Sequence, residues 1–239
     1  MKRPTLLLTG TSGVGKSTAV LRATHPATTL WICCERGALQ VAHAPELNPW
    51  RNGSATTPLI PHHVEALSPA QPFEEVDRIV RATVPQIRDG KIKAVVIDTL
   101  SSLCDREYAR IRMGDKVPES YGKANRMLAM RLQSILWHLL DTEAMVIAIA
   151  HEREPTTIEG KFMPGGPKLA GDLVRSVPAL FDMVLRLRIG LDSDGKPQRQ
   201  IAVDPMKQDY LTKDRFAVAV DGEPADLRAI LMRAVERRT

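Results

Sequence analysis

The sequence predicts an α/β fold in which a mainly parallel β-sheet is flanked by helices and ends in an antiparallel C-terminal extension. Short, continuous apolar runs recur along the chain between turn-forming residues, as is typical of strands that are buried on both faces. Segments with helical periodicity separate several of these runs, so their strands are expected to be parallel. The last three runs have no helical segment between them, and we expect them to form the antiparallel edge.

The expected strands are short apolar segments bounded by turn or polar residues. Five lie at residues 5–9, 28–34, 62–67, 93–98 and 144–150, and three late ones lie at 183–188, 200–203 and 216–220. Helical spacing predicts helices from a glycine-rich loop to about residue 23, and then at 72–88, 99–113, 120–141 and 225–237. Residues 44–61 and 152–166 contain Pro, Gly and polar residues and are expected to be irregular.

No linker divides these elements, so residues 1–239 are expected to form a single domain with a substantial core. Hydrophobic residues make up 44% of the chain and charged residues 26%, which is typical of globular proteins. In the 120–141 helix, a set of apolar residues at helical spacing is expected to lie in the core: Met127, Met130, Leu132, Ile135, Leu136 and Leu139.

The glycine-rich loop carries the clearest functional motif. Residues Gly10, Thr11, Ser12, Gly13, Val14, Gly15, Lys16 and Ser17 match G-x-x-x-x-G-K-[ST] in full, between an expected strand and an expected helix. Glycines allow backbone N–H groups to surround phosphate oxygens, and the helix N-terminus favours the negative charge. We therefore expect a P-loop that binds ATP, with Thr18 included in the site, Lys16 reaching the β- and γ-phosphates and the Ser17 hydroxyl ligating Mg²⁺.

Three further polar residues are expected at the same sheet edge, because each follows a buried strand. Asp98 ends the 93–98 strand and could support Mg²⁺ or cap the next helix. Since Thr99 rather than Glu follows Asp98, the catalytic base must come from elsewhere; Glu35, after the 28–34 strand, could orient the attacking water or form a surface ion pair with Arg36. His151 follows the 144–150 strand and could sense the γ-phosphate or be a structural histidine.

In this order, these residues resemble the RecA-like ATPases, which include recombinases, ring helicases and KaiC-like proteins. The resemblance covers roughly residues 5–220 and implies that Glu35 is the catalytic Glu, that Asp98 followed by Thr99 holds magnesium, and that His151 replaces the usual Gln sensor. It also implies a DNA-contacting loop over residues 152–169 and a Lys-x-Arg pair, Lys213 and Arg215, that reaches the nucleotide of a neighbouring subunit. The active unit is therefore expected to be a homo-oligomer, a ring or a filament.

The compact size is similar to that of small phage-type RecA-like ATPases, some of which are single-strand-annealing recombinases of the Sak group. Two departures weigh against filament formation and strand exchange. The sensor is His151 rather than Gln, and no N-terminal segment resembles the recombinase polymerisation element. The expected activity is ATP hydrolysis coupled to work on single-stranded DNA in recombination, annealing or replication.

The net charge of +5 and the pI of about 9.2 fit either a polyanionic partner or an Arg-rich solvated surface. For DNA, the basic and aromatic candidates are Arg106, Arg110, Arg112, Lys116, Lys123, Arg153, Lys161, Lys168, Tyr108, Tyr121 and Phe162. The alternative is that the first arginines pair with Asp105, Glu107, Asp115 and Glu119 on a solvated helix. Trp50 and Arg51 could flank the adenine.

Two other function classes stay open. A small-molecule kinase can share the P-loop but would need an Arg-rich lid, and a regulatory ATPase could use nucleotide to control assembly without DNA. No apolar run approaches the roughly 20 residues that span a bilayer, so no membrane partner is expected. With only three cysteines and no paired spacing, a cytoplasmic location is expected, in the host if the protein is phage-encoded.

Overall fold

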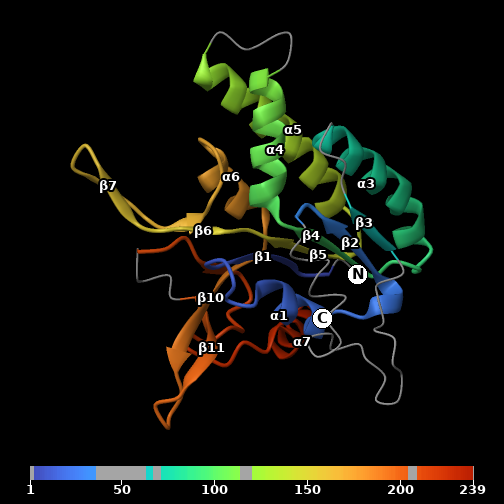
Figure 1. Cartoon of the computed structure of the whole chain (residues 1–239). Coiled ribbons are helices and arrows are strands. Elements are labelled where there is room, and N and C mark those ends of the chain that lie inside the picture. The colour runs from blue at the N-terminus through green and yellow to red at the C-terminus, as the bar shows by residue number, and fades with distance from the viewer. Residues whose placement is uncertain (1–2, 36–62, 67–70, 114–119, 204–208, 239) are drawn as a thin grey trace.

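The computed structural model describes residues 3–35, 63–66, 71–113, 120–203 and 209–238 (Figure 1). Its main sheet has eight strands in the order β11-β10-β1-β5-β4-β2-β3, with β12 also paired to β10. Every pairing from β10 through β1, β5, β4 and β2 to β3 is parallel, and only β11 and β12 are antiparallel to β10. This confirms the predicted α/β class with a mainly parallel sheet and an antiparallel C-terminal extension.

The strands of the parallel part are short. They are β1 (Thr5–Thr9), β2 (Thr29–Cys33), β3 (His63–Ala66), β4 (Ala94–Asp98), β5 (Met145–Ile149) and the first half of β10 (Met183–Leu191). The first five agree with the predicted strands to within one or two residues. Among these five, β1, β2, β4 and β5 are apolar runs whose residues are buried or nearly so.

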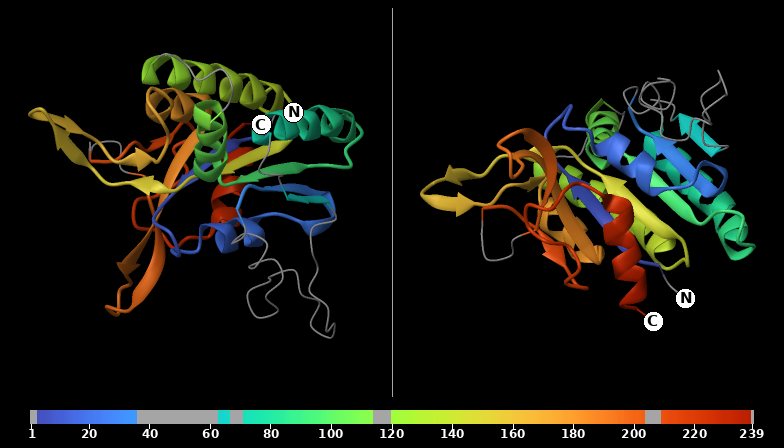
Figure 2. Two further views of the ribbon diagram at one scale, coloured as in Figure 1. Left: turned by 45° about the horizontal axis from the view of Figure 1, so that its top comes forward. Right: turned by 90° about the horizontal axis from the view of Figure 1, so that it is seen from below.

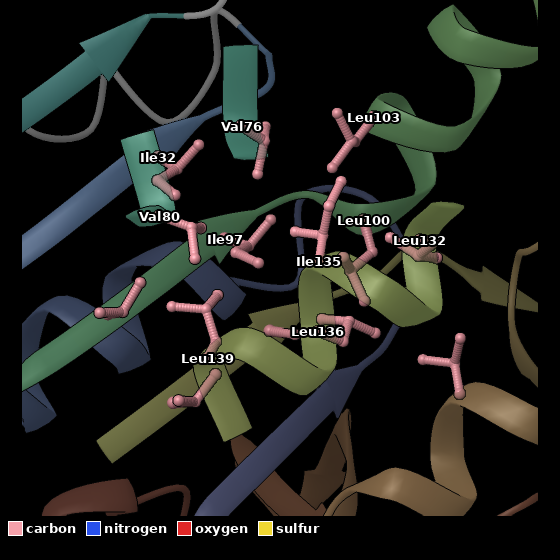
Figure 3. Packing of buried hydrophobic residues seen from close by; sticks show 14 of the residues in the cluster. Ile32, Val76, Val80, Ile97, Leu100, Leu103, Leu132, Ile135, Leu136 and Leu139 are labelled. Carbon is pink, nitrogen blue, oxygen red and sulfur yellow. The ribbon is translucent and has the colours of Figure 1, made fainter. Parts of the chain in front are cut away.

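Helices cover both faces of the sheet (Figure 1). On one face lie α3 (Pro72–Arg88), α4 (Leu100–Met113), α5 (Tyr121–Leu140) and α6 (Leu173–Leu180), and on the other lie α1 (Lys16–Ala23) and α7 (Leu227–Glu236). A 3-10 turn, Pro26–Thr28, leads into β2. Figure 3 shows the first face, where aliphatic side chains from α3, α4 and α5 meet Ile32 and Ile97 of the sheet.

The prediction of a core role for two methionines of α5 is wrong. Leu132, Ile135, Leu136 and Leu139 are buried as expected, but Met127 is 42% and Met130 is 66% exposed. The reason is that α5 is apolar on more than the one face that packs on the sheet, so helical spacing alone could not separate the two sets of positions.

Residues 152–166, expected to be an irregular loop, contain short strands instead. Glu152–Arg153 (β6) pairs with Gly166–Pro167 (β9), and Thr156–Ile158 (β7) pairs with Lys161–Met163 (β8) across the turn at Glu159 and Gly160. The β7–β8 hairpin stands away from the body of the molecule in each view of Figures 1 and 2. Its two strands have three residues each, which is too short for a periodic signal in the sequence.

The C-terminal extension differs from the prediction in one place. β11 (Pro197–Ala202) and the long β10 form a hairpin, but residues 216–220 are not a strand. The carboxylate of Asp214 accepts hydrogen bonds from the backbone N–H groups of Phe216, Val218 and Ala219, which curls the chain around it. The paired residues lie just before this turn, as β12 (Lys213–Asp214). Helix α6 was not expected either, since its eight residues include Pro178.

No helix in the described part of the chain is both long and apolar enough to cross a membrane.

Candidate nucleotide site

The P-loop connects the end of β1 to the first residue of α1, and its backbone requires glycine. Gly15, the residue before the helix, has a φ of 99°, and a Cβ placed on it would lie 2.6 Å from Arg199 Nε. A Cβ on Gly10 would lie 2.6 Å from the backbone oxygen of Leu187 on β10. The loop is therefore enclosed by the C-terminal extension, and Arg199 on β11 also donates a hydrogen bond to the Val14 carbonyl at 2.7 Å.

Lys16 is buried at the start of α1 and points back into the loop. Its Nζ donates to the carbonyl oxygens of Gly10 and Thr11, at 2.8 Å each. Burial lowers the pKa of Lys16, while the nearby carboxylates, above all that of Asp98, act in the opposite direction. A phosphate group in this loop would offer the ammonium group a better partner than two neutral carbonyls.

Ser17 and Asp98 form the second pair of the site. The Ser17 hydroxyl donates to Asp98 Oδ2 at 2.7 Å, across the space between α1 and the end of β4. Asp98 is fully buried, which raises the pKa of its carboxyl to about 6, and its Oδ1 has no hydrogen-bond partner within the described residues. A hydroxyl and a carboxylate with an unsatisfied oxygen are the hard oxygen donors that Mg²⁺ prefers, so these residues fit the expected magnesium site.

Glu35 is held in place by two side chains from neighbouring elements. The Cys34 N–H donates to the Asp98 carbonyl at 2.7 Å, which fixes the chain leaving β2 beside β4. Glu35 Oε2 then accepts a hydrogen bond from the Ser102 hydroxyl of α4 at 2.7 Å and lies 3.2 Å from His151 Nε2. The hydrogen bond with His151 is the largest influence that lowers the pKa of Glu35, so this carboxylate is ionised at neutral pH.

His151 follows β5, between the P-loop strand and the Asp98 strand. Its backbone N–H donates to Ser101 Oγ at 2.9 Å, and its carbonyl accepts from Lys168 N–H at 2.7 Å. Because β1, β5, β4 and β2 are adjacent in the sheet, their carboxyl ends bring Lys16, His151, Asp98 and Glu35 to one edge. Glu35 is thus part of this cluster with His151, whereas its alternative partner Arg36 lies outside the described residues.

A buried ion pair adjoins the cluster and was not anticipated from the sequence. The Glu152 side chain is 1% exposed and accepts two hydrogen bonds from Arg186 of β10, at 2.9 and 2.7 Å. The Arg186 guanidinium lies 3.6 Å from the centre of the Tyr210 ring, and the Tyr210 hydroxyl donates to Glu154. No sequence signal links these positions, because they meet only through the pairing of β1 with β10.

Ser102 and Arg199 were also missed. Ser102 could have been suspected from its place one turn after Asp98, at the start of a helix above the strand ends. Arg199 could not, because its contact with the loop depends on how the C-terminal hairpin folds back over α1.

The predicted Lys-x-Arg pair lies away from the P-loop of its own chain. Lys213 Nζ donates to the carbonyl oxygens of Pro178 and Ala179, at 3.0 and 3.2 Å, at the end of α6. Arg215 lies 3.5 Å from Asp182, which also accepts from the backbone N–H of Thr5 at the start of β1. Within one chain, these two residues and Lys16 are therefore at different ends of β1.

Some of the candidate DNA-binding residues are exposed, and others are already bound to groups of the same chain. Lys161, Phe162 and Lys168 are exposed, whereas Arg153 donates to the Pro164 carbonyl inside its loop. Arg110 pairs with Glu107, one of the partners that the alternative named, but Glu107 is buried and does not lie on a solvated face; Arg112 stacks on Tyr121. Trp50, Arg51, Lys116, Asp115, Glu119 and Arg36 lie outside the described residues.

A cavity of about 460 Å³ adjoins the P-loop between α1 and the start of α7. It is lined by Gly15, Thr18, Ala19, Arg22, Arg199 and residues 224–228. This cavity is the space next to the loop into which the base and ribose of a bound nucleotide could extend. A second cavity of about 480 Å³, lined in part by Arg3, Lys93 and Met145, lies at the opposite end of the strands.

Comparison with known proteins supports a P-loop NTPase fold. Residues 2–216 match the model of a family described as AAA domain. A search of curated proteins found no match to the chain.

Proposed function

Because the chain belongs to the AAA domain family, a group of nucleotide-dependent ATPases, we propose that it is a RecA-like ATPase that acts on single-stranded DNA in recombination, annealing or replication. The observation that carries the ATPase part is the meeting of Lys16, Asp98, Glu35 and His151 at four adjacent strand ends. Bound Mg²⁺ would neutralise phosphate charge and orient the phosphoryl group.

Each residue of the site has a separate role in the proposed hydrolysis. Lys16 would exchange its bonds to the Gly10 and Thr11 carbonyls for bonds to phosphate oxygens, and Ser17 and Asp98 would hold the metal. Glu35, ionised and fixed by Ser102 and His151, accepts a hydrogen bond from the attacking water and so orients it. A contact between the γ-phosphate and His151 would change the bond between His151 and Glu35, and this gives the sensor role a physical basis.

The DNA part rests on the β7–β8 hairpin. The hairpin begins five residues after His151, and both of its faces are exposed: one offers Lys161 for phosphates and the other offers Phe162 for base stacking. A change at His151 reaches the hairpin through only a few residues, the first of which is the buried Glu152. The oligomer and the trans contact of Lys213 and Arg215 belong to the same proposal, since these residues do not reach their own P-loop.

The test is steady-state ATP hydrolysis with and without single-stranded DNA, at low and moderate salt, with Lys16→Ala as the blank. Stimulation that fades as salt rises would support the proposal. The variants Lys161→Ala and Phe162→Ala should lose most of the stimulation. Ile189→Ala changes another exposed apolar residue, on the β10–β11 hairpin; it is the control and should keep the stimulation. Hydrolysis that is indifferent to DNA in the wild-type protein would refute the DNA part.

A second candidate is a regulatory ATPase that uses nucleotide to control its own assembly. It is favoured by the fact that several of the basic DNA candidates are already engaged within the chain, Arg110 with Glu107 and Arg153 with the Pro164 carbonyl. Nucleotide-dependent oligomerisation without stimulation by DNA would select this function.

A further inference from the structure

Helix α5 carries an apolar stripe on the face that points away from the sheet. Its buried face, with Leu132, Ile135, Leu136 and Leu139, packs into the core (Figure 3). On the opposite side, Met127, Met130 and Trp137 are 42%, 66% and 52% exposed, and Ser134 is exposed between them. Two methionines and a tryptophan in one row on a surface helix are more apolar than a solvated face requires.

The spacing of this stripe is that of a helix–helix seam. Residues 127, 130, 134 and 137 follow the alternating intervals of three and four that place side chains along one line of a supercoiled helix pair. The same intervals continue to Lys123 before the stripe and to Asp141 after it, both of which are exposed. We call the row Lys123, Met127, Met130, Ser134, Trp137 and Asp141 the α5 seam; it is about 27 Å long at 1.5 Å per residue.

The α5 seam is complementary to itself when it is turned end to end. In an antiparallel pair of two copies centred between Met130 and Ser134, each Met130 lies opposite Ser134 of the other copy, a large side chain against a small one. Met127 lies opposite Trp137, and the ammonium group of Lys123 lies opposite the carboxylate of Asp141. A parallel pair would instead place each charge against its own like charge.

We propose that two copies of this chain dimerise through the α5 seam, in an antiparallel arrangement with two-fold symmetry. The occupant is a second copy because one register satisfies all three kinds of contact: apolar, small against large, and opposite charge. A two-fold interface of this kind is closed and uses the same patch on both subunits. It does not involve the P-loop, β12 or the β7–β8 hairpin, so it goes beyond the proposed function and is independent of nucleotide.

The flanks of the seam allow this arrangement. Arg126 and His138, both exposed, face each other in the same register, and His138 Nε2 lies 3.4 Å from Arg81 of its own chain. Arg131, on another side of α5, is bound to Glu74 and the buried Glu107 and takes no part.

The experiment is sedimentation equilibrium of the full chain at about pH 8, without nucleotide and with a chelator, over a wide concentration range. The wild-type protein should be a dimer at the higher concentrations. Met130→Glu places two charges at the centre of the seam and should raise the dimer dissociation constant by at least about a hundredfold. Met232→Glu, a similarly exposed methionine on α7, is the matched control and should leave it unchanged.

A charge exchange tests the register. Lys123→Glu and Asp141→Lys should each weaken the dimer by roughly tenfold, because each creates two like-charge contacts per dimer. The double variant should restore most of the affinity, since it recreates the opposite pairs in reverse. Circular dichroism and nucleotide binding show that each variant is folded.

Three outcomes would overturn the proposal. They are a wild-type protein that stays monomeric at all concentrations, a Met130→Glu protein that dimerises as tightly as the wild type, and a double charge variant as weak as the worse single one. Failure of ATP hydrolysis or of DNA stimulation would not change these results, so the dimer and the proposed function can fail separately.

Discussion

His151 Nε2 lies 3.2 Å from Glu35 Oε2, and the Ser102 hydroxyl donates to that same oxygen at 2.7 Å. The contact joins the ends of β5 and β2, which are separated in the sheet by β4. It leaves Glu35 Oε1 as the oxygen that can face a water molecule. It also connects the carboxylate that we propose to orient the water with the strand end that leads into the β6–β9 segment.

Glu35→Gln should reduce the steady-state rate of ATP hydrolysis by roughly 10²–10⁴-fold while leaving nucleotide affinity within a few-fold. The amide keeps the size of the side chain and can still bond to Ser102, but it lacks the charge that orients and polarises the water. The check is hydrolysis combined with equilibrium binding of a fluorescent nucleotide. Glu159→Gln, at the exposed turn of the β7–β8 hairpin, is the control. Unchanged hydrolysis in Glu35→Gln would remove Glu35 from the mechanism.

Gly15→Ala should abolish nucleotide binding and destabilise the fold. A φ of 99° costs a non-glycine residue about 1–2 kcal/mol, and the new methyl group would also displace Arg199 from the loop. Gly195→Ala provides a comparison, because Gly195 has a φ of 75° but its Cβ would meet no atom within 4 Å. It should lose a similar amount of stability and bind nucleotide normally. Equal binding by both variants would show that the Arg199 contact has no role in the loop.

The free energy of unfolding of the metal-free protein should depend on pH because of the buried carboxyl of Asp98. Burial raises the pKa of this carboxyl to about 6 in the folded protein, above its value of 3.8 in the unfolded chain. The folded state therefore binds the proton more tightly, so this contribution is full below about pH 4 and is lost as the pH rises through 6, by up to about 3 kcal/mol. Denaturant unfolding is measured in the presence of a chelator for the wild type and for Asp98→Asn. The difference between the two proteins gives the contribution of Asp98. The stability of the wild type relative to the variant should fall over this interval, and a constant difference would contradict the assignment.

Arg186→Met should destabilise the protein by about 3–5 kcal/mol, because it leaves the Glu152 carboxylate buried without a partner. The double variant Glu152→Gln with Arg186→Met should recover a large part of this loss, since no charge is then left buried. Urea unfolding of the two proteins measures the difference. If the double variant were as unstable as the single one, packing of Arg186 on Tyr210 rather than the charge of Glu152 would explain the loss.

The sequence predicted the strands whose ends form the site because these are apolar runs that end next to glycine, an acidic residue or histidine. The order of strands in space then brought Lys16, Asp98, Glu35 and His151 together, as parallel topology requires. Sequence could not reveal Arg199 or Arg186, since each reaches the site by tertiary packing alone. It also misjudged Met127 and Met130, because periodicity shows that a residue is on an apolar face but not whether another element covers that face. The strand expected at 216–220 does not form, because the Asp214 carboxylate accepts hydrogen bonds from the backbone N–H groups of Phe216, Val218 and Ala219.

The trans contact gives the last prediction. Lys213 and Arg215 bind to the end of α6 and to Asp182, away from the P-loop of their own chain, so Arg215→Ala should leave nucleotide binding intact. If Arg215 completes the site of a neighbour, the variant should hydrolyse ATP at least about a hundredfold more slowly. Mixing it with Lys16→Ala should restore part of the activity, since in mixed assemblies an intact P-loop can face an intact Arg215. The mixture is titrated over a range of ratios, with Arg78→Ala, at an exposed position of α3, in place of Arg215→Ala as the control. No recovery at any ratio would count against a shared site.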